Sequence, residues 1–63
     1  MESIRIAREK AGLSQSELGE IVNLDQATIS RIEAGERRVF IDQLCDIADA
    51  LGVPVSRLIK QAA

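Results

Sequence analysis

The stretch QSELGEIVNLDQATISRIEAG, from Gln15 to Gly35, is the part of the chain that decides its fold. Apolar residues recur in it at the spacing of two short amphipathic helices: Leu18, Val22, Ile29 and Ile32. Between the two halves lies Asn23, which tolerates the left-handed backbone conformation that a sharp turn between helices needs. Asp25 follows as an N-cap, because its carboxylate can accept a hydrogen bond from the free N–H groups of a first helical turn. The stretch therefore predicts two helices, at about 15–22 and 26–34, joined by a tight turn.

Three further features support this interpretation. Ser14 precedes the first helix and Glu17 lies three residues after it, the spacing of a capping box. Gly19 has no side chain, which lets the second helix cross closely over the first; a simple tolerated substitution is the alternative explanation. Two helices in this arrangement, over about 15–34, form a helix-turn-helix, whose second helix enters the DNA major groove. The recognition helix is then the segment at about 26–34.

Other residues extend the pattern over most of the chain, from about Ile4 to Ile59. They are Leu13-Ser14-Gln15, Glu17-Leu18, Thr28-Ile29-Ser30-Arg31-Ile32-Glu33, Gly35 and Leu51-Gly52-Val53. Together they resemble the Xre/Cro/C1-repressor class of helix-turn-helix proteins. This resemblance implies a five-helix, lambda-repressor-like DNA-binding domain. It also implies a homodimer that binds a two-fold symmetric operator in double-stranded DNA.

Residues that commonly begin or end helices place the remaining helices at about 2–11, 41–51 and 55–61. Glycines follow three of the expected helices, where a C-terminal left-handed residue is common, and Pro54 suits the start of the last one. We therefore expect an all-α, five-helix single domain over residues 1–63. The positions expected in the core of the last two helices are Ile41, Leu44, Cys45, Ile47, Ala48, Leu51, Leu58 and Ile59. By contrast, Ile6 and Ile21 fall off the main apolar stripes.

The composition excludes several classes of protein. The chain has 63 residues, a single cysteine and no histidine, so it offers no internal disulfide and no usual set of metal ligands. We find no nucleophile–base pair and no phosphate-binding glycine loop, and we therefore expect no enzyme activity and no cofactor. No segment reads as a membrane span or a signal peptide. A cytoplasmic protein without membrane contact is the simplest expectation.

Helical geometry indicates which side chains of the recognition helix are available to DNA. With Ile29 and Ile32 in the core, the opposite face carries Ala27, Ser30, Arg31 and Ala34, with Gln26 at its N-terminal edge. Glutamine can bond adenine and arginine can bond guanine, each through two hydrogen bonds, and alanine can contact the thymine methyl group. The resemblance makes Gln26, Ala27 and Arg31 the candidates for base reading. The alternative is that Gln26 and Arg31 are ordinary solvated side chains without a role in binding.

The resemblance also implies contacts with the DNA backbone and one internal ion pair. The candidates for phosphate binding are Gln15, Thr28, Ser30, Arg37 and Arg38. Arg8 falls among the core-facing positions of the first helix, and Glu33 borders the apolar stripe of the third. The family often pairs these two positions in a partly buried salt bridge that orients the recognition helix. Phosphate binding by Arg8, or two solvated side chains, are the alternatives.

The charge balance is the main objection to DNA binding. A DNA-binding domain usually has a basic surface, yet this chain has a net charge of −2. From Arg31 to Arg38 there are three arginines and two glutamates, whereas Ile41–Leu51 contains three aspartates and no base. Few phosphates are neutralised by each subunit, which favours a dimer. The balance also leaves open a protein-interaction or antitoxin-like module, or the N-terminal DNA-binding piece of a larger regulator.

The expected dimer surface lies around the connection between the last two helices. It consists of Val53, Pro54 and Val55, with Ser56 and Arg57 beside them. Val55 is the expected apolar contact across the two-fold axis. Phe40 stands where the family often has a serine-like N-cap, so the phenyl ring packs on Val39 and the last helix or lies in the same subunit interface.

Overall fold

The structure is a computed structural model that describes residues 1–60, and in this range the fold is all-α. Its helices are α1 (Glu2–Lys10), α2 (Gln15–Val22), α3 (Gln26–Glu33), α4 (Ile41–Leu51) and α5 (Val55–Lys60). The predicted helices agree with these bounds to within one residue. The expected end of the last helix at Gln61 lies outside the described residues.

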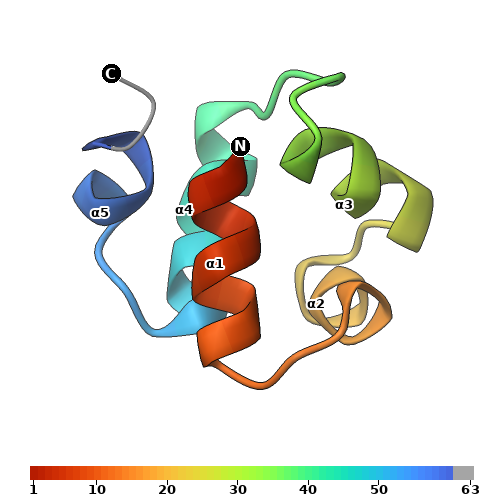
Figure 1. The fold of residues 1–63 in the computed structure, drawn as a ribbon, viewed down its shortest axis with the longest axis horizontal. Helices are drawn as coiled ribbons and strands as arrows, with labels where there is room; N and C mark the ends of the chain where they lie inside the picture. Colours follow the sequence, from red (N-terminus) through yellow and green to blue (C-terminus); the bar gives the residue numbers. More distant parts are fainter. Residues whose placement is uncertain (61–63) are drawn as a thin grey trace.

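The helices surround a single apolar cluster to which each of them contributes. Its buried members are Ile4, Leu18, Ile29, Ile32, Leu44, Ile47, Ala48, Leu51 and Leu58. Burying one large aliphatic side chain stabilises a fold by about 1.5–3 kcal/mol, so this cluster supplies the main stabilising term. Figure 1 shows α2 and α3 stacked on one side of α1 and α5 on the other, with α4 behind α1. The predicted helix-turn-helix thus lies at the opposite end of the molecule from α5.

Polar contacts fix how α1 sits against its neighbours. The Ser3 hydroxyl is buried and donates a hydrogen bond of 2.8 Å to the carbonyl oxygen of Leu58 in α5. The amino group of Met1 donates to the carbonyl oxygens of Ile32 and Glu33, at the end of α3. The first helix therefore bridges the recognition helix and the last helix.

Several expected core positions are wrong. Ile41 and Ile59 are 61% and 47% exposed, and Cys45 is also exposed. In α4 the buried side is set by Leu44, Ile47, Ala48 and Leu51, and Ile41 and Cys45 both lie just beyond its edge. Among the α5 side chains that the structure describes, Leu58 alone is fully buried, and Val55, one turn earlier, packs against the core from a half-buried position.

Phe40 is 65% exposed, so its expected packing on Val39 and the last helix is also wrong. The phenyl ring cannot accept a hydrogen bond as a serine cap would. Instead, the Gln43 side chain accepts one of 3.2 Å from the backbone N–H of Phe40. In this bond the backbone of the N-cap residue is the donor, whereas the side chain of a serine cap would be an acceptor. The phenyl ring is left facing outward.

Candidate DNA-binding surface

The start of α2 and the turn that follows it are fixed by local hydrogen bonds. Ser14 accepts a bond of 3.0 Å from the Glu17 backbone N–H, and the Glu17 carboxylate accepts one of 2.8 Å from the Ser14 N–H, so the capping box forms. Asn23 adopts the left-handed conformation, with φ of 61°. The predicted turn geometry is therefore present, and it directs the chain from α2 into α3.

Asp25 caps the recognition helix. Its carboxylate accepts a hydrogen bond of 2.8 Å from the Thr28 backbone N–H. Hydrogen bonds from the side chain and backbone of Thr28 are also the main cause that lowers the pKa of Asp25, and the charges of Arg31 and Arg37 add to them. The capping group is thus a carboxylate at neutral pH, which suits the positive end of the helix dipole.

Gly19 is needed for close packing, although the packing partner differs from the expected one. A Cβ atom at this position would collide with the carbonyl oxygen of Leu24. The Leu24 N–H donates a hydrogen bond of 2.8 Å to the Gly19 carbonyl, which holds the turn in this place. The turn itself, rather than the body of α3, therefore lies over Gly19.

The outer face of α3 presents the residues that helical geometry predicts. Gln26, Ala27, Ser30 and Arg31 are exposed, Thr28 is half-buried, and Ile29 and Ile32 are buried. The candidate base-reading residues therefore share one open surface. In Figure 1 this helix lies at the edge of the molecule above α2, and its exposed residues lie on the face away from α1 and α2.

Arg8 and Glu33 form the predicted ion pair between α1 and α3. The Arg8 Nε atom lies 2.7 Å from one carboxylate oxygen of Glu33, and Arg8 Nη2 lies 3.2 Å from the other. The two side chains are only 11% and 3% exposed. The hydrogen bond to Glu33 is the main cause that raises the pKa of Arg8. Arg8 also donates to the Leu13 carbonyl oxygen at 2.8 Å, so a single guanidinium joins α1, the α1–α2 loop and α3.

The ion pair continues outward to the first residue of the recognition helix, a link that the sequence did not predict. Gln15 donates a hydrogen bond of 3.1 Å to Glu33 and accepts one of 3.5 Å from Gln26. Ser16 donates to Gln26 at 3.4 Å. The sequence indicates this link only indirectly: Gln15 and Gln26 each follow an N-cap residue, so each begins a helix of the helix-turn-helix motif. These long, exposed hydrogen bonds place the Gln26 amide beside Gln15 and Ser16 at the start of α3.

Positive charge lies beside this face in the loop between α3 and α4. Arg37 and Arg38 are exposed there, and Arg31 is exposed on α3. Within residues 1–60 none of these three guanidinium groups lies in an ion pair. The acidic residues Asp42, Asp46 and Asp49 belong to α4. The unpaired cations thus lie at the end of the molecule that carries α3.

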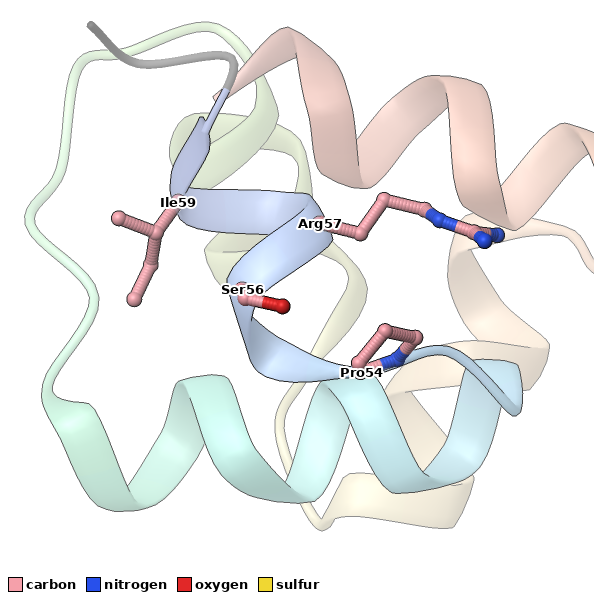
Figure 2. A pocket seen from close by; sticks show the side chains of 4 residues that line it. All are labelled: Pro54, Ser56, Arg57 and Ile59. Carbon is pink, nitrogen blue, oxygen red and sulfur yellow. The ribbon is translucent and has the colours of Figure 1, made fainter.

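The residues expected in a dimer interface divide into two groups. Val53 and Val55 are half-buried and pack against the core, whereas Pro54, Ser56 and Arg57 are exposed. Figure 2 shows Pro54, Ser56, Arg57 and Ile59 around a shallow hollow on α5, with Ile59 directed away from the body of the helix. Val55 therefore offers less apolar surface than the sequence suggests, and Ile59 offers more.

Two further properties concern the described part of the chain. No helix in it is long and apolar enough to cross a membrane. Residues 1–60 also contain no group of three or more His, Cys, Asp or Glu side chains that is arranged to hold a metal ion.

Comparison with known proteins agrees with this geometry. A family model described as "Helix-turn-helix" matches residues 4–58. The chain is 37% identical over 59 residues to an uncharacterized HTH-type transcriptional regulator of Sinorhizobium medicae (strain WSM419), and equally to one of Rhizobium meliloti (strain 1021). Each match covers 94% of this chain and 42% of the relative, so the chain spans about two fifths of their length. The chain therefore belongs to the helix-turn-helix family of DNA-binding transcriptional regulators, of the Xre/Cro/C1 type that its sequence resembles.

Proposed function

We propose that this protein is a sequence-specific repressor that binds an inverted-repeat operator in double-stranded DNA as a homodimer. The observation that carries the proposal is the open face of α3, where Gln26, Ala27 and Arg31 are exposed side by side. An exposed helix face of this width fits the major groove of B-form DNA. Repression follows by occlusion of a promoter that overlaps the operator.

The roles of the side chains follow from their chemistry and position. Gln26 bonds an adenine and Arg31 a guanine, each through two hydrogen bonds, and Ala27 contacts a thymine methyl group. Gln15, Thr28 and Ser30 contact phosphates on either side of the groove. Arg37 and Arg38 bind the backbone of the adjacent strand without reading sequence.

Gln15 has a second role in this proposal. It is hydrogen-bonded to both Glu33 and Gln26, so it transmits the fixed position of the buried ion pair to the base-reading amide. Gln26 then loses less side-chain freedom when it binds. A restricted polar side chain contributes more to binding than a free one, because less conformational entropy is lost.

The homodimer follows from charge and from exposed apolar surface. The net charge of −2 provides little non-specific attraction to DNA, so a second half-site has to add binding energy. Phe40, Ile41 and Ile59 are large apolar residues exposed on α4 and α5 or at their edges. We assign them, with Pro54 and the edge of Val55, to the contact between two copies. Half-sites about 34 Å apart would then present two recognition helices to one face of the DNA.

Selection from a random duplex library at low salt tests the proposal. The wild-type protein should enrich an inverted repeat whose half-sites are one helical turn apart. The matched control is Gln26→Ala combined with Arg31→Ala, which leaves the buried residues of α3 in place and should enrich no sequence.

Enrichment of single half-sites without symmetry would remove the homodimer from the proposal. Absence of any enriched sequence, with a folded wild-type protein, would favour the protein-interaction alternative.

A further inference from the structure

We propose that the surface between α1 and α5 is a docking groove for a second copy of this chain, which inserts Ile21 from the end of α2. The contact is heterologous: one copy supplies the groove and the other supplies Ile21. It lies apart from Phe40 and from the DNA-binding face, and it adjoins the rest of the two-fold dimer surface, because Arg57 lines both the groove and the hollow beside Pro54 and Ile59.

The groove has an apolar floor and a cationic rim. Ile6 and Ala7 of α1 and Val53 after α4 are half-buried and enclose a cavity of about 80 Å³. Lys10 and Arg57 are exposed at its edge, and Figure 2 shows the Arg57 side chain extended from α5 toward α1. Within residues 1–60 neither cation lies in an ion pair.

The groove requires no hydrogen-bonding group from its occupant; it favours only negative charge at the rim. Ser3 also lines it, but its hydroxyl already donates to the Leu58 carbonyl oxygen. The chemistry therefore fits a short aliphatic side chain flanked by carboxylates.

The same chain displays such a group elsewhere. Ile21 is 57% exposed at the end of α2, in a surface hollow that it shares with Asp46 and Asp49 of α4. Neither carboxylate lies in an ion pair within the described residues. The hollow thus combines one exposed aliphatic side chain with two carboxylates that no ion pair within the described residues neutralises.

Charge complementarity and topology make a second copy the occupant. The groove offers two cations around an apolar floor, and the hollow offers two anions around an apolar side chain. The two surfaces are formed by different helix pairs, α1 with α5 and α2 with α4, and share no residue. In this proposal the two surfaces therefore meet between molecules.

A heterologous contact leaves one groove and one Ile21 free on each pair of molecules, so it can continue along a row of copies. The contact area is small, and such contacts are weak. It therefore acts when copies are held close together, as on adjacent DNA sites, where the effective concentration is high.

Charge reversal tests the contact without DNA, so its outcome is independent of the proposed operator binding. Sedimentation velocity of the wild type at low salt should show self-association that increases with concentration and declines as salt screens the charges. Lys10→Glu and Asp49→Lys should each weaken this association about tenfold, because each replaces an attraction by a repulsion. Ile21→Ser should also weaken it, and this substitution leaves the core intact because Ile21 is exposed.

Mixing the two charge variants gives the sharpest result. The Lys10→Glu copy retains its carboxylates and the Asp49→Lys copy retains its cationic groove. In an equimolar mixture the two variants should therefore form pairs about as strongly as the wild type does. The matched control is Glu36→Lys, which reverses an exposed charge outside both surfaces and should associate as the wild type does.

Restored association in the mixture, with both single variants weak, supports a heterologous contact. Equal association of the wild type, Lys10→Glu and Asp49→Lys would overturn the proposal, as would a mixture no stronger than its components. Either of these results would mean that any occupant of the groove is a partner other than this chain.

Discussion

Glu33 is the residue on which the candidate DNA-binding surface depends most. Its carboxylate accepts two hydrogen bonds from Arg8 and one from Gln15, and its side chain is 3% exposed. A buried ion pair of this kind is weak evidence for net stability, because removing the two charges from water is costly. Its clearer effect is on orientation, since it joins α1 to the helix that carries the candidate base-reading residues.

The first prediction concerns this pair. Glu33→Ala should reduce the free energy of unfolding by about 3–5 kcal/mol, because the Arg8 guanidinium would remain largely buried without its partner. The double variant Arg8→Met with Glu33→Leu should recover most of the loss, since it removes both charges and retains the volume. Thermal unfolding followed by circular dichroism measures both. Equal melting temperatures for Glu33→Ala and the wild type would contradict a structural role for the pair.

The second prediction separates base reading from phosphate binding. Arg31→Ala should weaken binding to the selected operator by about 1–3 kcal/mol and relax the preference at one base pair in each half-site. Arg38→Ala should instead weaken binding to all sequences similarly and reduce the salt dependence of the affinity. Fluorescence anisotropy titrations on operator and scrambled duplexes at several salt concentrations measure both effects. Equal losses on the two duplexes for Arg31→Ala would place Arg31 among the phosphate contacts.

At the scale of single elements, the turn between α2 and α3 sets the geometry of the motif. Its backbone passes over Gly19, turns at Asn23 in the left-handed conformation and enters α3 through the Asp25 cap. Each of these features is local in sequence. Together they determine where α3 begins, and the buried Ile29 and Ile32 then determine which of its faces points outward.

The third prediction tests the close packing at Gly19. Gly19→Ala should lower the free energy of unfolding by about 1 kcal/mol, because the strain of overpacking against the Leu24 carbonyl, roughly 1–3 kcal/mol, exceeds the gain of about 1 kcal/mol in helix propensity. Gly19→Val should lose more. Urea unfolding measures these changes, with the exposed neighbour Glu20→Ala as control. A stabilised Gly19→Ala variant would show that the turn shifts readily to accommodate the added methyl group.

The fourth prediction concerns the pH dependence of the Asp25 cap. Because folding lowers the pKa of Asp25 below its ordinary value of 3.8, the ionised cap stabilises the fold above that value. The contribution is lost as the pH falls through the folded-state pKa. Asp25→Asn retains a capping oxygen without the charge. The melting temperature of the wild type relative to Asp25→Asn should therefore stay constant from pH 7 to about 5 and fall below that range. A difference independent of pH would remove the carboxylate from the capping role.

At the scale of the whole molecule, functional surfaces are distributed around a small core. The candidate DNA-binding face occupies the α2–α3 end, and the exposed apolar residues Phe40, Ile41 and Ile59 belong to the segment that starts α4 and to α5. Both ends connect to the same apolar cluster. A substitution that disturbs this cluster would therefore affect the proposed DNA binding and the proposed self-association together, and tests of either proposal need exposed positions.

The fifth prediction follows from this distribution. Phe40→Glu should weaken the two-fold dimer and leave the helical content and melting temperature of the monomer nearly unchanged, because the ring is 65% exposed. Val55→Glu should instead unfold part of the population, since Val55 packs against the core. Sedimentation equilibrium and circular dichroism distinguish the two effects. If Phe40→Glu dimerises as the wild type does, the two-fold interface lies elsewhere.

The sequence by itself determined the local features of this protein. The Ser14 capping box, the left-handed Asn23 and the Asp25 cap follow from the chemistry of a few neighbouring residues, and they place α2 and α3 within one residue of their observed bounds. Periodicity likewise identifies the outward face of α3. The ion pair between Arg8 and Glu33, 25 residues apart, came from the family resemblance, because no local rule joins such distant positions.

Only the tertiary structure decided which marginal apolar residues are buried and which polar groups meet. Ile41, Cys45 and Ile59 satisfy the periodicity of a core but lie at the edge of it, where neighbouring helices do not reach. The link from Glu33 through Gln15 to Gln26 depends on how α2 packs against both ends of α3. The physical reason is that capping and turn formation depend on neighbouring residues, whereas burial and side-chain networks depend on the relative placement of whole helices.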